Sequence, residues 1–283
     1  MSKRSKIVFQ GELGANSHIA CNQAYPRHEP VPCPTFEDAF NAVGRGQADL
    51  AMIPIENSVA GRVADIHHLM PTAGLHIIAE WFLPIRNQLL APKGATRRGI
   101  KTVESHVMAL GQCRNFLRKL GAQTIVAADT AGAAREVAER GDKTRAAIAS
   151  RLAAEIYGLN IIAEDIEDET HSTTRFIVLS RKKQWAPPAK NLVTTFIFLV
   201  RNIPAALYKA MGGFATNGVN MTKLESYMIE GNFFATQFYS DVEGHPDDPD
   251  LKLALDELKF FSSQFKILGV YPAHRFRLKN QKN

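Results

Sequence analysis

Cysteine is scarce in this 283-residue chain, which has three, at Cys21, Cys33 and Cys113. Their number is odd, and no two of them have the Cys-x-x-Cys spacing. This pattern argues against a disulfide framework and against a structural zinc site. It is typical of a reducing compartment, so we expect a cytoplasmic protein.

Long hydrophobic runs are also missing. The strongest apolar run, Leu192–Val200, has the length of one strand and is too short to cross a bilayer. The chain starts with Met1-Ser-Lys-Arg-Ser-Lys and then enters Ile7–Phe9, without the hydrophobic region of a signal peptide. We therefore expect neither a membrane partner nor secretion.

The chain has no large excess of charge of one sign, since it contains 34 Lys and Arg residues and 28 Asp and Glu residues. Much of the net charge of +6 lies in Arg181–Lys183 and in the tail His274–Asn283. No recognition helix or aromatic-basic strand accompanies these segments, so a solvated linker and tail are favoured over nucleic-acid binding. A positive balance gives weak support for an anionic metabolite.

The N-terminal two thirds of the chain alternate strand-like apolar runs with helical patterns, which predicts an α/β domain with largely parallel sheets. One helix is expected to start near Ser17 and another to run from Asn57-Ser58 to about Met70. Thr130 is expected to cap a helix over 131–140 that stops at Gly141. The expected strands are 6–10, 49–55, 75–83, 85–91, 123–127 and 145–149.

The segment Gln184–Lys190 interrupts this alternation of strands and helices, because its adjacent prolines can continue neither a helix nor a sheet. Beyond it a βαββαβ order predicts a ferredoxin-like module with a hairpin turn at Glu230–Asn232. Its expected elements are strand 191–200, helix 204–217, strands 219–229 and 232–242, helix 247–263 and strand 265–272. The predicted domains are a catalytic domain over residues 1–183, a linker 184–190, a regulatory module 191–275 and a basic tail 276–283.

Polar clusters follow strands at three junctions, Gly11–Ser17, Pro54–Ser58 and Ser105–Cys113. Helix N-termini carry unpaired N–H groups and a partial positive charge, which suits carboxylates. Each cluster alone is explained by helix capping. Together with Asp168–Phe176, which places a hydroxyl and a guanidinium at the start of an apolar strand, they favour one shared anionic ligand.

In this order and at these separations, the four motifs resemble the prephenate dehydratase family, from about Lys6 to Ala273. The resemblance implies a catalytic domain of two lobes around a cleft, similar to periplasmic binding proteins, followed by an ACT regulatory domain. It implies conversion of prephenate to phenylpyruvate without a cofactor. It also implies feedback by L-phenylalanine and a homodimer or homotetramer.

The resemblance makes Thr174 the essential residue, either as a hydrogen-bond donor or as a proton relay to the leaving oxygen. Ser105 and Gln112 are seven residues apart and could share one face of a helix. For Arg175, a substrate carboxylate and a structural ion pair with Glu164–Glu169 remain equally open. The implied catalytic residues are Thr174, Asn57, Ser105 and Gln112, and the implied substrate-binding residues are Ser17, Ser58, His106, Arg175 and Phe176.

The implied effector pocket contains Ala205, Ala206, Leu207, Glu225 and Ser226. The sequence departs from the family here, because alanine replaces the usual glycine at position 205 and Tyr-Met replaces the usual Arg-Pro at 227 and 228. In the catalytic domain, Val107 replaces a usual proline and Ser172 a common asparagine.

Two alternatives remain open at this point. Arogenate dehydratase acts on the amino analogue of the substrate, and the motifs do not separate it from prephenate dehydratase. A non-catalytic amino-acid sensor would need none of the set Asn57, Ser105, Gln112 and Thr174, all of which are present.

Overall fold

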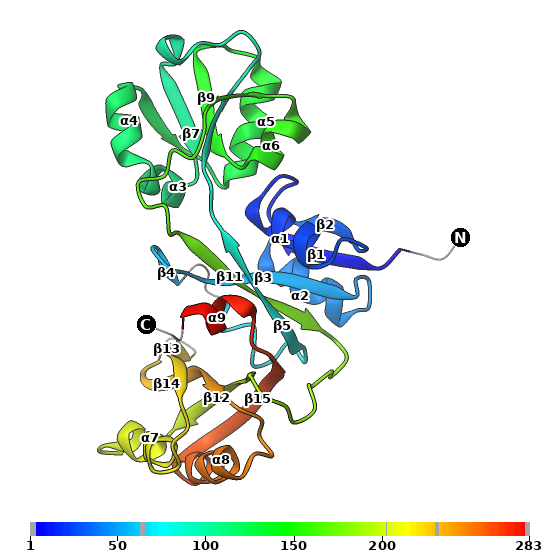
Figure 1. Cartoon of the computed structure of the whole chain (residues 1–283), viewed down its shortest axis with the longest axis vertical. Helices are drawn as coiled ribbons and strands as arrows, with labels where there is room; N and C mark the ends of the chain where they lie inside the picture. Colours follow the sequence, from blue (N-terminus) through cyan, green and yellow to red (C-terminus); the bar gives the residue numbers. More distant parts are fainter. Residues whose placement is uncertain (1–3, 63–65, 202, 230–231, 281–283) are drawn as a thin grey trace. The chain divides into compact units, whose positions relative to one another are not determined.

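The computed structural model describes residues 4–62, 66–201, 203–229 and 232–280 (Figure 1). Its backbone divides into two compact units. Unit 1 comprises Met1–Ala42, Ala51–Ala64 and Trp81–Phe176, and unit 2 comprises Val43–Leu50, Asp65–Glu80 and Ile177–Asn283. The predicted domains are continuous segments whereas these units are not, so the domain boundaries remain predictions.

Five strands of the larger, ten-stranded sheet follow one another in the order β5-β11-β3-β1-β2, and β4 pairs with β3. Strands β1 and β2 are parallel, and apolar side chains such as Ile7 and Phe9 are fully buried. The elements of this region are β1 (Lys6–Gln10), α1 (Asn16–Ala24), β2 (Glu29–Cys33), α2 (Phe36–Gly44), β3 (Leu50–Asn57), β4 (Gly61–Arg62), β5 (His76–Pro84) and β11 (Thr173–Ser180).

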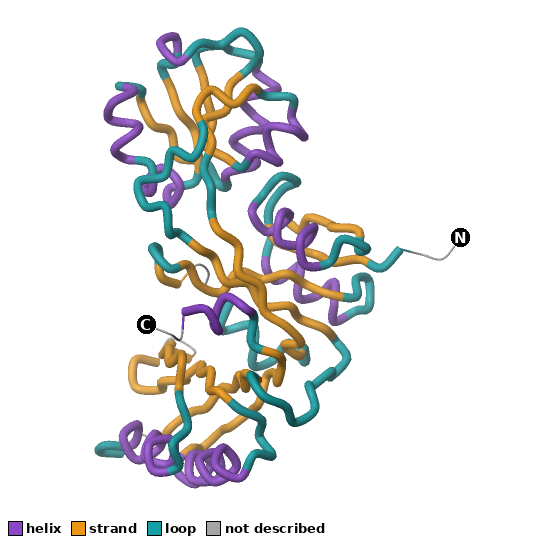
Figure 2. The backbone as a smooth tube through the Cα atoms, in the orientation of Figure 1, coloured by secondary structure: helices purple, strands orange, loops and turns teal. Residues whose placement is uncertain are grey.

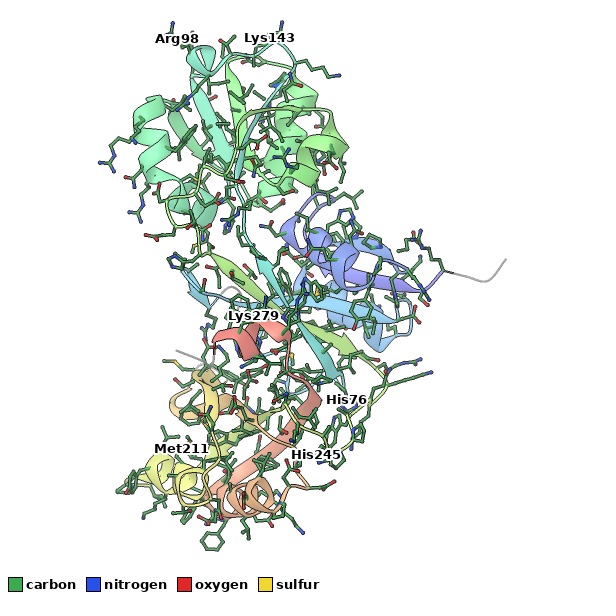
Figure 3. The ribbon with its side chains drawn as sticks, in the orientation of Figure 1. His76, Arg98, Lys143, Met211, His245 and Lys279 are labelled. Atoms are coloured by element: carbon green, nitrogen blue, oxygen red, sulfur yellow. The ribbon has the colours of Figure 1, made fainter. Side chains whose placement is uncertain are left out.

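The second sheet of unit 1 has the order β10-β6-β9-β7-β8. It is mixed, because β6 is antiparallel to β9 and β10 whereas β7 is parallel to β8 and β9, so the prediction of largely parallel sheets is wrong here. Arg98 and Lys143 point outward from this region (Figure 3). Its elements are β6 (Gln88–Ala91), η1 (Arg97–Gly99), β7 (Thr102–Ser105), α3 (Val107–Gln112), α4 (Arg114–Leu120), β8 (Gln123–Val126), α5 (Thr130–Arg140), β9 (Arg145–Ala149), α6 (Arg151–Tyr157) and β10 (Asn160–Ala163).

The helix predicted after Asn57 is wrong. Strand β3 continues to Asn57, whose side-chain oxygen accepts hydrogen bonds from the backbone N–H groups of Val59 and Ala60. These bonds turn the chain into the short strand β4 instead of starting a helix.

Helix α5 has the predicted end but not the predicted cap. Gly141 lies in the left-handed region (φ 64°), as expected for a helix C-terminus. The N-cap is Asp129, whose carboxylate accepts from the N–H of Gly132, and Thr130 is the first helical residue. A carboxylate at this position also interacts favourably with the helix dipole.

The C-terminal region of unit 2 has the predicted βαββαβ order, and the predicted α/β fold class is confirmed. Its strands are antiparallel in the order β13-β14-β12-β15, with α7 and α8 on one face (Figure 2). Glu230 and Gly231 of the predicted turn lie outside the described residues. The elements are β12 (Leu192–Val200), α7 (Ala206–Thr216), β13 (Met221–Ile229), β14 (Asn232–Glu243), α8 (Pro249–Phe261), β15 (Ser262–Pro272) and α9 (Arg275–Asn280).

Aromatic packing fills the space between this sheet and its helices. Phe196 of β12 stacks on Phe214 of α7 at 6.0 Å between ring centroids, and Phe198 stacks on Phe238 of β14 at 5.1 Å. Strand β12 has a neighbouring strand on each side, and its residues from Leu192 to Phe198 are buried. That burial explains why this run is the strongest in the sequence.

The basic tail is not simply solvated, so that prediction is wrong. It forms α9, in which the Arg277 guanidinium pairs with Glu80 at 2.8 Å and with Asp241 at 3.2 Å. Both carboxylates are fully buried, so Arg277 packs α9 against the body of unit 2. Among the described residues, no helix has the length and apolar character needed to span a membrane.

Candidate active site

Asn57 has a fixed side-chain orientation at the end of β3. Its Oδ1 accepts from the backbone N–H groups of Val59 (2.9 Å) and Ala60 (2.8 Å). A backbone N–H can only donate, so the other end of the amide must be the NH₂ group. That group donates to Ser172 Oγ at 3.1 Å and to Thr174 Oγ1 at 3.0 Å.

Thr174 is therefore an acceptor toward Asn57 and keeps its own proton for another partner. Its side chain is buried, and it lines a cavity of about 180 Å³ together with Asn57, His106 and Gln112. Arg62 brings a cation and Asn16 a polar amide to the same cavity. The arrangement can bind a small anion and donate a hydrogen bond to it from Thr174.

Gln112 joins the same network from α3. Asn87 Nδ2 donates to Gln112 Oε1, and Gln112 Nε2 donates to Ser172 Oγ, both at 3.5 Å. Asn87 is held in turn, because its backbone N–H donates to the buried carboxylate of Glu167 at 2.9 Å. Sequence reasoning did not identify Asn87, which lies between two strands without a recognisable motif.

Ser105 has a different position from the one predicted. It is the last residue of β7, it is fully buried, and its hydroxyl donates to the carbonyl oxygen of Ile148 at 2.6 Å. Helix α3 starts two residues later with His106 as its N-cap. Ser105 and Gln112 therefore do not share a helical face, and the argument from their spacing is wrong.

Three other predicted residues have the following positions and partners. His106 accepts from the N–H of Met108 through Nδ1, and it lines the smaller cavity. Ser58 donates to the carbonyl oxygen of His171 at 3.1 Å and accepts from the N–H of Thr173 at 3.0 Å. Ser17 is a buried residue in the first turn of α1, not its N-cap.

Arg175 forms a structural ion pair, but its partner is not in the acidic run Glu164–Glu169 considered from the sequence. Its guanidinium is 2% exposed and pairs with Glu56 at 2.8 Å, which lies next to Asn57 in β3. This ion pair holds β3 against β11 beside the Asn57–Thr174 hydrogen bond. Phe176 is buried in β11 and belongs to the core.

A second cavity, of about 610 Å³, adjoins the first, and the two share Ala60, Met108 and Gln112. Val107 and Met108 are half exposed and give one side of it an apolar character. Arg114 and Arg118 of α4 bring positive charge, and Ser172 lies in its wall. Sequence reasoning did not predict this cavity, because its residues come from the turn between β3 and β4, from α3 and α4, and from the segment before β11.

Cys113 lies next to Gln112 but is not a nucleophile. It is fully buried, and burial raises the pKa of its thiol to about 12, with a further contribution from Glu167 and Asp168. Burial likewise raises the pKa of Cys21 to about 12. Both thiols stay protonated near neutral pH, so they cannot supply a thiolate.

The predicted effector residues lie in unit 2. Ala205 is the N-cap of α7 with φ 60° and ψ 22°, Ala206 is buried, and Leu207 packs against the core between sheet and helices. The Glu225 carboxylate lies 3.4 Å from His67 and 2.9 Å from Lys223. Ser226 is exposed on the opposite face of β13, since successive strand residues alternate.

Comparison with known proteins identifies the family of the chain. The family described as Prephenate dehydratase matches residues 7–184. The bifunctional N-acyl-homoserine lactone acylase/prephenate dehydratase of Komagataeibacter europaeus is 52% identical, covering 96% of this chain and 98% of the relative. Arogenate dehydratase 2 of Petunia hybrida is 38% identical, covering 95% of this chain and 72% of the relative.

A solved structure extends the likeness to three dimensions. Prephenate dehydratase of Arthrobacter aurescens, in complex with L-Phe, is 32% identical with a TM-score of 0.86, covering 94% of this chain and 89% of that one. The family match covers the segments that hold Asn57, Gln112 and Thr174. The chain is therefore an enzyme of the prephenate dehydratase family.

Proposed function

We propose that the Asn57–Thr174 site converts prephenate to phenylpyruvate, carbon dioxide and water. The ring carboxylate leaves as carbon dioxide, and the electron pair of the broken C–C bond moves into the ring. The C–O bond to the ring hydroxyl breaks, and the oxygen takes up one proton and leaves as water. Aromatisation drives the reaction, so the site needs to orient the substrate and assist the leaving oxygen.

The observation that carries this proposal is the hydrogen bond from Asn57 to Thr174. A threonine hydroxyl is a poor acid by its own pKa. Held as an acceptor by Asn57, it can direct its proton toward the leaving oxygen, which gains negative charge in the transition state. This geometry favours direct donation over the relay that the sequence left open.

Purified protein incubated with prephenate should form phenylpyruvate, measured by its absorbance in base. The same assay with arogenate, which gives phenylalanine, compares the two substrates. Turnover of neither would contradict the dehydratase proposal and favour the non-catalytic sensor.

A second candidate activity is hydrolysis of N-acyl-homoserine lactones. It is favoured by the high identity to the Komagataeibacter europaeus relative, whose name includes that acylase activity. The larger cavity has the size of a small-ligand pocket, and Val107 and Met108 could contact an acyl chain. Release of homoserine lactone, followed by mass spectrometry beside the prephenate assay, would decide whether this chain has both activities.

We propose further that the βαββαβ module is an ACT domain that binds L-phenylalanine between paired copies in a homodimer or homotetramer. The module offers an edge strand for pairing, since β13 ends its sheet. Leu224 and Met228 of that strand are 41% and 56% exposed, although apolar. A cytoplasmic location belongs to the same proposal.

Phenylalanine at millimolar concentration should bind the full-length protein and inhibit the dehydratase reaction. The inhibition requires that the ligand bind one state of the enzyme better than the other. Calorimetry measures the binding, and light scattering measures the mass of the assembly. A monomer that gives no heat with phenylalanine would contradict the regulatory proposal.

Two alanine-to-glycine variants, at Ala205 and at Ala215, test how the backbone at the start of α7 affects stability. The left-handed backbone of Ala205 is unfavourable for a residue with a Cβ, by about 1–2 kcal/mol. Ala205→Gly should therefore stabilise the protein without weakening phenylalanine binding. Ala215→Gly, at an exposed position of α7, should instead destabilise it by about 1 kcal/mol, because glycine weakens an ordinary helical position.

A further inference from the structure

We infer that the Ser172 hydroxyl binds the keto oxygen of the substrate side chain and makes the site prefer a 2-keto acid to the corresponding 2-amino acid. The inference rests on the proposed dehydratase function and names the preference that the family resemblance leaves open. Ser172 immediately precedes β11, two residues before Thr174, and its side chain is 1% exposed.

The hydrogen bonds of Ser172 determine what its hydroxyl can do. Asn57 Nδ2 donates to Ser172 Oγ at 3.1 Å, in the direction fixed by the backbone N–H groups on the other end of that amide. Gln112 Nε2 donates to the same oxygen at 3.5 Å. A hydroxyl has two acceptor sites and one proton, so Ser172 has only its proton left to offer.

The backbone around Ser172 holds the hydroxyl in place. Its carbonyl oxygen accepts from the N–H of Ile85 at 2.8 Å, and its N–H donates to the carbonyl oxygen of Glu169 at 3.4 Å. A buried side chain with both sides of its backbone bonded loses little freedom on binding a ligand. The donor is therefore already oriented before the substrate arrives.

Ser172 and Thr174 face different spaces. Thr174 lines the smaller cavity and Ser172 lines the larger one, and the same Asn57 amide bonds to both. If the ring hydroxyl of the substrate lies at Thr174, the side chain of the substrate can extend into the larger cavity. Gln112 lies in the walls of both cavities and so borders both ends of such a substrate.

A donor-only hydroxyl discriminates between the two side chains. A keto oxygen only accepts hydrogen bonds, whereas an ammonium group only donates them near neutral pH. The Ser172 hydroxyl can donate its proton to the keto oxygen, but it cannot donate to an ammonium group, which has only protons to offer. Both substrates carry the same two carboxylates, so cations such as Arg62 and Arg114 cannot make this distinction.

The test compares kcat/KM for prephenate and for arogenate in the full-length protein. Ser172→Ala removes an acceptor of Asn57 and Gln112 and should lower both values, but the prephenate value should fall by about 10- to 100-fold more than the arogenate value, because only prephenate also loses a bond to its keto oxygen. Ser172→Thr keeps a hydroxyl and should retain most of the wild-type ratio. Thermal unfolding of each variant checks the fold.

Thr173→Val is the matched control, at the next residue, where β11 begins. The Thr173 hydroxyl donates to the carbonyl oxygen of His171 at 3.3 Å, so its proton is already used within the protein. This variant should keep the wild-type ratio of the two substrates.

Equal losses on both substrates in Ser172→Ala would overturn the inference, because the hydroxyl would then contact a group that they share. An unchanged prephenate value would overturn it as well. Wild-type protein that turns over prephenate supports the dehydratase function whatever Ser172 does. If the wild-type protein is inactive on both substrates, the result contradicts the dehydratase function and also the inference, which depends on it.

Discussion

Thr174→Ala should lower kcat for prephenate by about 100- to 10,000-fold, the range found for loss of a group that assists proton transfer in the transition state. KM should change much less, because the contact strengthens as the oxygen leaves rather than when the substrate binds. The effect is expected to be large because Asn57 orients the Thr174 hydroxyl at 3.0 Å within a buried pocket. Steady-state kinetics with phenylpyruvate detection measures both constants.

Two further variants separate the chemistry of Thr174 from its packing. Thr174→Ser keeps the hydroxyl and should recover some of the lost rate. Thr173→Val, which alters the neighbouring hydroxyl, should keep kcat near the wild-type value. A Thr174→Ala enzyme with nearly normal kcat would show that the hydroxyl does not take part in the reaction.

Arg277→Met should lower the free energy of unfolding by about 3–5 kcal/mol, the usual cost of removing one partner from a buried ion pair. It takes a cation away from Glu80 and Asp241, whose side chains are both fully buried in unit 2. Asp241 also accepts from Thr195, so the loss extends into the sheet. Urea unfolding followed by circular dichroism measures the change.

Lys279→Met in the same helix is the matched control, because Lys279 is exposed and its loss should cost less than about 0.5 kcal/mol. Adding Glu80→Gln to Arg277→Met should recover some of the lost stability, since a neutral amide needs no cation. Equal stability of Arg277→Met and Lys279→Met would show that the network contributes nothing and that α9 is simply a surface helix.

Much of the fold could be predicted from local patterns. Strand 145–149, the end of α5 at Gly141 and the βαββαβ order after the proline-rich segment depend on hydrophobic periodicity and turn residues that lie close together in the chain. The four motifs also indicated the family that the comparisons confirm. One error came at Asn57, where a helix was predicted. Its side chain instead bonds to the next backbone N–H groups and turns the chain toward β4.

The sequence by itself thus determined the class of fold, the family and the residue types available for chemistry. Only the tertiary structure decided the positions and partners of these residues, because the partners are far apart in the chain. Ser105 bonds to Ile148, Arg175 pairs with Glu56, and Asn57 bonds to Thr174. Hydrogen bonds and ion pairs depend on distance and direction in space, which strand pairing sets and local sequence patterns do not record.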